Sequence, residues 1–127
     1  MNTKLINIQV LALLGDAIYS LYIREELIKQ GINNIEKLQK KQVEYVSAKG
    51  ETKILNYLID NNILTEEELD IVKRGRNYKN NSHPKNTDII TYKLSTGFES
   101  LLGDLYISNK NRLEEISSFY QETIESL

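Results

Sequence analysis

Two acidic residues stand where the sequence is otherwise strongly apolar. Asp16 ends the stretch "LLGD" and is followed by "AIYSLYI", and Glu99 lies in "STGFESLLG". An acid buried without a partner is costly, because even a neutral polar group without one costs about 1–3 kcal/mol. We therefore expect something to offset the cost of burying Asp16: a basic partner, a shifted pKa, a place on a cleft wall or a bound cation. The alternative is an acid at a helix edge that faces solvent or an arginine.

Carboxylates from two packed helices make an oxygen site of the kind that holds Mg²⁺ or Mn²⁺. Such an ion prepares a water nucleophile and stabilises charge on a phosphodiester. A second acid, Asp104, follows Glu99 in a second "LLGD". The two are separated by about 140° around an ideal helix, so they do not readily serve one site. We expect Asp104 to be a surface or interface residue, and the repeat of "LLGD" to be no internal duplication.

A basic segment precedes Glu99. Residues 73–93 carry six Lys or Arg and one Asp, whereas the whole chain has a net charge of −2. Non-specific affinity for nucleic acid depends on such local clusters more than on total charge. The alternative is a solvated helix end. The candidate RNA contacts are Lys73, Arg74, Arg76, Asn77, Lys79, His83, Lys85, Asn86 and Lys93.

The elements that must position these residues are helices. Apolar residues recur three or four apart along most of the chain, and no segment alternates as a strand does. Gly31 is expected to stop the first helix, and Thr65 with Glu68 forms a capping box. Gly75 is expected to be a helix end or a point of backbone approach to RNA. We predict an all-α fold of about six helices, over residues 4–29, 34–39, 41–60, 65 into the basic segment, 87–108 and 112–124, with a loop at 80–86.

Composition bounds the class of protein. The chain has 127 residues, which fits one domain over residues 1–127. It has no cysteine, which excludes disulfides and thiolate metal sites. No apolar run reaches the roughly 18 residues that a membrane span needs. We expect a cytoplasmic protein with no membrane partner.

The paired motifs carry a family resemblance. "LALLGDAIYSLYIRE" followed by "YKLSTGFESLLGDLYI" resembles the catalytic domain of ribonuclease III. It is most similar to the Mini-III ribonucleases, which lack a double-stranded-RNA-binding domain. "HPKNTD" leading into "TYKLSTGFE" is the part most particular to that group. The resemblance covers essentially the whole chain.

The resemblance implies a homodimer with a valley for duplex RNA and one metal-dependent site in each subunit, the two sites cutting opposite strands. It implies products with a 5′-phosphate and a 3′-hydroxyl, and maturation of both ends of precursor 23S ribosomal RNA, with room for help from a ribosomal protein. Carried over by motif, Asp16 and Glu99 are catalytic and bind Mg²⁺, for which Mn²⁺ substitutes. Ala12 and Thr96 stand where full-length ribonuclease III has a Glu and an Asp. With fewer acids, the number of metal ions in each site, one or two, stays open.

Two other functions stay open at the level of sequence. One is a non-catalytic module for duplex-RNA binding or ribosome assembly on the same helical scaffold. The other is a helical protein-interaction domain, which requires that the basic segment bind no RNA.

Overall fold

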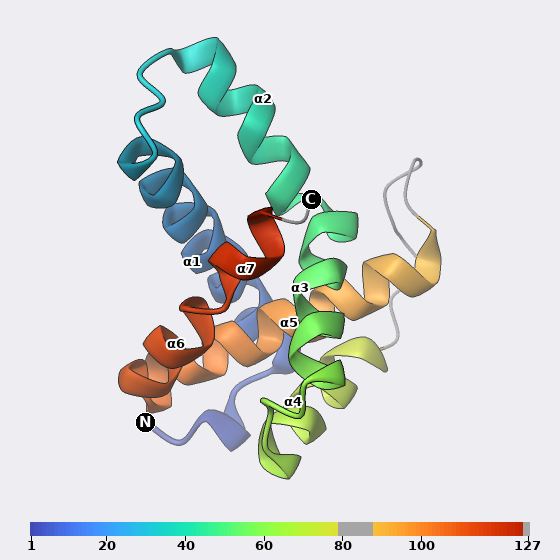
Figure 1. Ribbon diagram of the computed structural model, residues 1–127. Coiled ribbons are helices and arrows are strands. Elements are labelled where there is room, and N and C mark those ends of the chain that lie inside the picture. The colour runs from blue at the N-terminus through green and yellow to red at the C-terminus, as the bar shows by residue number, and fades with distance from the viewer. Residues whose placement is uncertain (79–87, 126–127) are drawn as a thin grey trace.

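The computed structural model describes residues 1–78 and 88–125, and every regular element in these ranges is helical (Figure 1). None of these helices is long and apolar enough to cross a membrane. The all-α prediction is confirmed. The elements are η1 (Thr3–Leu5), α1 (Ile8–Lys29), α2 (Ile35–Val46), α3 (Ala48–Asp60), α4 (Glu66–Arg76), α5 (Ile89–Ser108), α6 (Lys110–Ser117) and α7 (Tyr120–Glu125).

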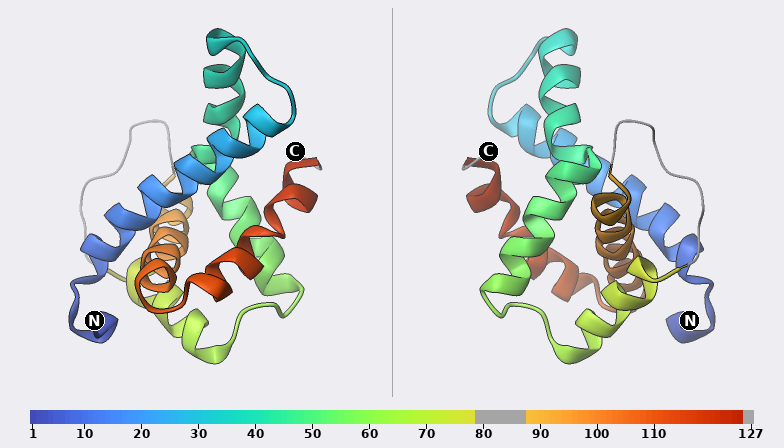
Figure 2. Two further views of the ribbon diagram at one scale, coloured as in Figure 1. Left: turned by 90° about the vertical axis from the view of Figure 1, so that its left-hand side faces the viewer. Right: turned by 90° about the vertical axis from the view of Figure 1, so that its right-hand side faces the viewer.

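Helix α5 is the centre of the fold. It packs against α1, α3, α4 and α6, and Figure 1 shows it running across the middle of the molecule. Figure 2 shows that the C-terminal half of α1 and all of α2 extend away from this centre, and these two helices pack against each other. The arrangement makes the contact between α1 and α5 decisive, because each of these helices carries one of the two acids singled out above.

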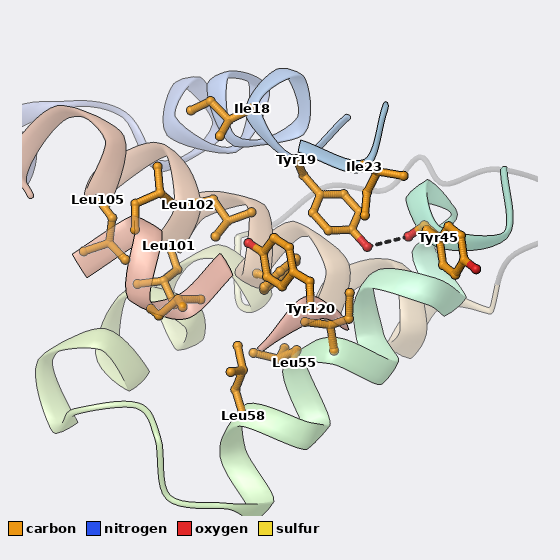
Figure 3. Close-up of a cluster of buried hydrophobic side chains, with 14 of the residues drawn as sticks. Ile18, Tyr19, Ile23, Tyr45, Leu55, Leu58, Leu101, Leu102, Leu105 and Tyr120 are labelled. Atoms are coloured by element: carbon orange, nitrogen blue, oxygen red, sulfur yellow. Dashed lines mark hydrogen bonds between the residues drawn. The ribbon is translucent and has the colours of Figure 1, made fainter. Parts of the chain in front are cut away.

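The core beside this contact is built on aromatic rings (Figure 3). The ring of Tyr19 packs edge-on against Phe98 and against Tyr120, with centroids 5.5 Å apart in both pairs. Its hydroxyl donates to the main-chain oxygen of Tyr45 at 2.8 Å, the dashed line in Figure 3. This one side chain therefore ties α1 to α5, to α7 and to the end of α2.

Capping residues set helix bounds that differ from those the apolar pattern predicts. The first α-helix begins at Ile8 instead of residue 4, because the side chain of Asn7 accepts from the main-chain N–H of Gln9. The helix predicted over 41–60 is broken at Ser47, whose hydroxyl accepts from the N–H of Gly50 and starts α3. The part before this break is continuous with the helix predicted over 34–39, and together they form α2. The last predicted helix is two helices, α6 and α7. The predicted loop at 80–86 lies outside the described residues.

Helix α4 begins with the predicted capping box and holds a buried acid. The hydroxyl of Thr65 accepts from the N–H of Glu68, and the Glu68 carboxylate accepts from the N–H of Thr65. Arg112 donates to the same carboxylate through Nε and Nη2, both at 2.8 Å. Burial alone would raise the pKa of Glu68, but the bonds from Arg112 and Thr65 outweigh it and lower the pKa.

Candidate active site

Three helices bring three carboxylates to one place. Asp16 comes from α1, Glu99 from α5 and Glu51 from the first turn of α3, and one oxygen of each lies within 4.8 Å of the others. Asp16 is exposed, Glu99 is half-buried and Glu51 is only 1% exposed. The acids named from sequence thus lie side by side, and Asp16 takes the position of an acid on a cleft wall.

Two glycines set the separation of α1 and α5. A Cβ on Gly15 would lie 1.8 Å from the carbonyl oxygen of Glu99, and a Cβ on Gly103 would lie 1.9 Å from the carbonyl oxygen of Leu11. These are the glycines of the two "LLGD" stretches, and each rests on the backbone of the other helix. The backbone of Glu99 therefore touches the residue that precedes Asp16, which is why the two acids share a site.

A third glycine places Glu51. A Cβ on Gly50 would lie 2.4 Å from the carbonyl oxygen of Glu44 and 2.6 Å from that of Tyr45. Together with the cap by Ser47, this contact seats the first turn of α3 on the end of α2. The Glu51 side chain is thereby held inside the molecule.

The electrostatics of the cluster favour a proton or a cation. Burial raises the pKa of Glu99 to about 8, and a hydrogen bond with Asp16 and its charge add to the rise. Burial likewise raises the pKa of Glu51 well above its usual value, helped by the charges of Glu99 and Asp16. Within the described residues both ion pairs are made by Arg112, with acids outside this cluster. Three oxygen donors without a basic partner fit a divalent cation such as Mg²⁺ or Mn²⁺.

The cluster opens into a pocket of about 480 Å³. Asp16 and Glu99 line it, together with Ala12 and Thr96, the two positions where full-length ribonuclease III carries further acids. The rest of the lining comes from the start of α1, the end of α4 and the first half of α5: Asn7, Gln9, Val10, Leu13, Gly75, Tyr78, Tyr92 and Lys93. A pocket lined by two acids and a lysine suits an anionic substrate held through a metal ion.

The described part of the basic segment borders this pocket. Lys73, Arg74 and Asn77 are exposed at the end of α4. Arg76 is half-buried and its Nε donates to the side-chain oxygen of Asn77 at 3.2 Å, while Lys93 lies on the pocket wall. The remaining candidate RNA contacts, Lys79, His83, Lys85 and Asn86, lie outside the described residues.

Two expectations are wrong. Asp104 is 6% exposed in this chain instead of lying at a surface, because the Ser108 hydroxyl one turn later donates to its carboxylate at 3.0 Å. Gly75 does not end α4, whose C-cap is Asn77, although it lines the pocket. It is buried, and a Cβ there would lie 2.5 Å from the hydroxyl of Ser100, so it serves the packing of α4 on α5.

Sequence reasoning missed Glu51. The surrounding stretch "KGETK" is polar and carries no motif. A signal was nevertheless present, since Glu51 precedes Leu55 and Leu58 by four and seven residues, the spacing of one helix face. Both leucines are fully buried, so an acid in register with them is an acid on the inward face.

A fold that is helical in every regular element of its described ranges, with a central α5 and a carboxylate pocket where α5 packs on α1, defines the class. Residues 9–110 match the family model described as "Ribonuclease III domain", a range that contains all three acids. The protein is thus a ribonuclease of the ribonuclease III class.

The most similar curated relatives specify the group. A Mini-ribonuclease 3 from Streptococcus pneumoniae is 41% identical over 125 residues, which cover 98% of each chain. A Mini-ribonuclease 3 from Brevibacillus brevis is 49% identical over 114 residues, 89% of this chain and 84% of that one. A crystal structure of a Fusobacterium nucleatum protein matches with a TM-score of 0.77 at 34% identity, over 91% of this chain and 89% of that one. The chain belongs to the Mini-ribonuclease 3 family.

Proposed function

We propose that this protein is a divalent-metal-dependent endoribonuclease that cuts double-stranded RNA. The observation that carries the proposal is the cluster of Asp16, Glu51 and Glu99, which lacks a basic partner among the described residues and opens into a pocket bordered by the basic end of α4. The names of the relatives support a ribonuclease, and the family resemblance supports duplex RNA as the substrate.

Asp16 and Glu99 would hold the catalytic ion. Bound Mg²⁺ or Mn²⁺ supplies a water of lowered pKa and neutralises charge that develops on a phosphodiester. Asp16 is exposed and would face the RNA strand, and the Gly15 contact keeps Glu99 beside it. Lys93 on the pocket wall offers a positive charge to the phosphate. The expected products carry a 5′-phosphate and a 3′-hydroxyl.

The basic end of α4 would bind the RNA backbone. Duplex RNA is recognised mainly through its shape, phosphates and 2′-hydroxyls, which suits exposed Lys73 and Arg74 beside the polar Asn77. In the proposal, the contacts continue through the other candidate residues of the basic segment: Arg76, Lys79, His83, Lys85, Asn86 and Lys93.

The proposal extends to a homodimer in which residues 1–127 form one catalytic domain. This dimer would act in the cytoplasm on both ends of precursor 23S ribosomal RNA, and a ribosomal protein could assist it. Large apolar side chains are exposed along α1, among them Val10, Leu13, Leu21 and Ile28, with Leu13 74% exposed. An apolar surface of this kind supports association of two copies. Light scattering is expected to give twice the mass of the chain, and a monomer at micromolar concentration would contradict the dimer.

A cleavage assay tests the function. Duplex RNA is incubated with the protein in Mg²⁺ or in EDTA, and the variants Asp16→Asn and Asp104→Asn are compared. We expect Mg²⁺-dependent strand breaks from the wild type and from Asp104→Asn, the matched acid of the other "LLGD", and at least a hundredfold loss in Asp16→Asn. A folded Asp16→Asn protein that cuts at the wild-type rate would overturn the assignment. If the protein binds duplex RNA without breaking it, it is a non-catalytic RNA-binding module. If it does not bind duplex RNA, it is a protein-interaction domain.

A further inference from the structure

Glu51 is the acid of the cluster that has no assigned role. It is 1% exposed, and its Oε1, shielded from solvent, has no hydrogen-bond partner among residues 1–78 and 88–125. Its neighbours in the cluster, Asp16 and Glu99, are also acids, and a hydrogen bond joins the side chains of Glu51 and Glu99. The capped and glycine-packed first turn of α3 keeps this side chain from turning out to water.

The same fold shows how it stabilises an acid that has a structural role. Glu68 is also buried, at 6% exposure, yet its carboxylate accepts two hydrogen bonds from Arg112 and one from the backbone of Thr65. Glu51 has no comparable set of donors among the described residues. A carboxylate that is buried beside other acids, with one oxygen unpartnered, costs free energy, and a bound cation offsets that cost.

The geometry also suits a shared cation. Oxygens that bind one Mg²⁺ at about 2.1 Å lie about 3–4 Å apart, and those around a larger ion lie somewhat farther apart. The three carboxylate oxygens lie within 4.8 Å of one another, so shifts on the order of an ångström bring them to coordinating positions.

We infer that Glu51 is a third protein ligand of the divalent cation, on the buried side of the site that Asp16 and Glu99 form. The inference rests on the proposed metal-dependent function and adds a residue to it. Glu51 compensates in part for Ala12 and Thr96, which give the pocket no carboxylates. The site then has one exposed, one half-buried and one buried acid, so that RNA and water reach the cation from the side of Asp16.

Mn²⁺ binding to the RNA-free protein tests the inference. Free Mn²⁺ is followed by electron paramagnetic resonance for the wild type, Glu51→Gln and Glu44→Gln, with folding checked by circular dichroism. Glutamine keeps the shape of Glu51 and can still donate to Glu99, so it removes the ligand charge while preserving a structural hydrogen bond. Glu44→Gln removes an exposed acid at the end of α2 and controls for net charge.

We expect Glu51→Gln to weaken Mn²⁺ binding by more than about tenfold, the lower end of the effect of losing a group that only orients metal ligands. Glu44→Gln should bind as the wild type does. Equal Mn²⁺ affinity in wild type and Glu51→Gln would overturn the inference. If Glu51→Gln does not fold, Glu51→Asp is used instead, because it withdraws the carboxylate by one methylene. Weaker Mn²⁺ binding by Glu51→Asp would support Glu51 as a ligand, and unchanged Mn²⁺ binding would overturn that role.

Cleavage of duplex RNA, measured separately, distinguishes the two proposals. A wild type that cuts RNA while Glu51→Gln binds Mn²⁺ normally refutes the role of Glu51 alone. A wild type whose Mn²⁺ binding depends on Glu51 but that leaves RNA intact refutes the nuclease alone.

Discussion

Replacing Gly15 with alanine tests whether the contact between α1 and α5 positions the active site. The new Cβ would lie 1.8 Å from the carbonyl oxygen of Glu99, and it must lie at least 3.0 Å away, so the two backbones must separate by about 1.2 Å. The obstructing atoms are backbone atoms in the middle of a helix, which have little room to yield. Displacements of about 1 Å in a catalytic group cost roughly a hundredfold in rate.

The stability cost follows from the same contact. Overpacking of this kind costs about 1–3 kcal/mol or somewhat more, and the better helix propensity of alanine returns about 1 kcal/mol. We expect a net loss of about 2 kcal/mol in the free energy of unfolding for Gly15→Ala. Gly103→Ala is the matched control, because its Cβ would lie 1.9 Å from the carbonyl oxygen of Leu11 and forces apart the same two helices without touching Glu99.

The assay is single-turnover cleavage of duplex RNA at saturating Mg²⁺, at a temperature where thermal melts show all proteins folded. Gly15→Ala should be about a hundredfold slower than the wild type, and Gly103→Ala should lose similar stability but much less rate. Wild-type cleavage by a folded Gly15→Ala protein would refute the reasoning. An equal loss in both variants would show that helix separation in general, and not the backbone of Glu99, sets the rate.

Three further outcomes are expected. Burial raises the pKa of Glu99 to about 8 and that of Glu51 well above its usual value, so folding favours the protonated form of both acids. Their contribution to the stability of the metal-free protein should therefore be fully present below about pH 4.3, the ordinary pKa of Glu, and should be lost as the pH rises toward 8. Thermal melts in EDTA measure this dependence, and a flat profile would contradict it. Arg112→Met strips buried Glu68 of its partner and should cost about 2–3 kcal/mol in urea unfolding, with cleavage by the folded protein unchanged. Arg74→Ala should weaken duplex-RNA binding and reduce the slope of log affinity against log salt by about one, and an unaltered slope would remove Arg74 from the contact surface.

The sequence predicts the helical class and two of the three acids for a physical reason. Asp16 and Glu99 stand out because they interrupt apolar helix faces, and such interruptions are local and readable. Glu51 does not stand out, because its polar neighbours hide that its own face is buried. Its role depends on how α3 meets α1 and α5, which is a tertiary contact.

The same limit explains the errors at helix ends and glycines. The break at Ser47 depends on one hydroxyl that caps Gly50, and the apolar pattern continues across it. Gly75 carries the signature of a helix end, yet it is small because Ser100 of α5 lies against it. Burial of Asp104 depends on a donor one turn away that the apolar pattern does not weigh.

The central position of α5 has a consequence for the order in which the protein is made. The Ser100 hydroxyl of α5 donates to the carbonyl oxygen of Ile8 at the start of α1, across 92 residues of chain. At synthesis rates of about 5–20 residues per second, roughly 5–20 s separate the emergence of these two residues from the ribosome. During that time α1, α3 and α4 lack the helix on which they pack, and Asp16 lacks Glu99. A growing chain, itself surrounded by ribosomal RNA, therefore does not contain the complete cluster of three acids until α5 has been translated.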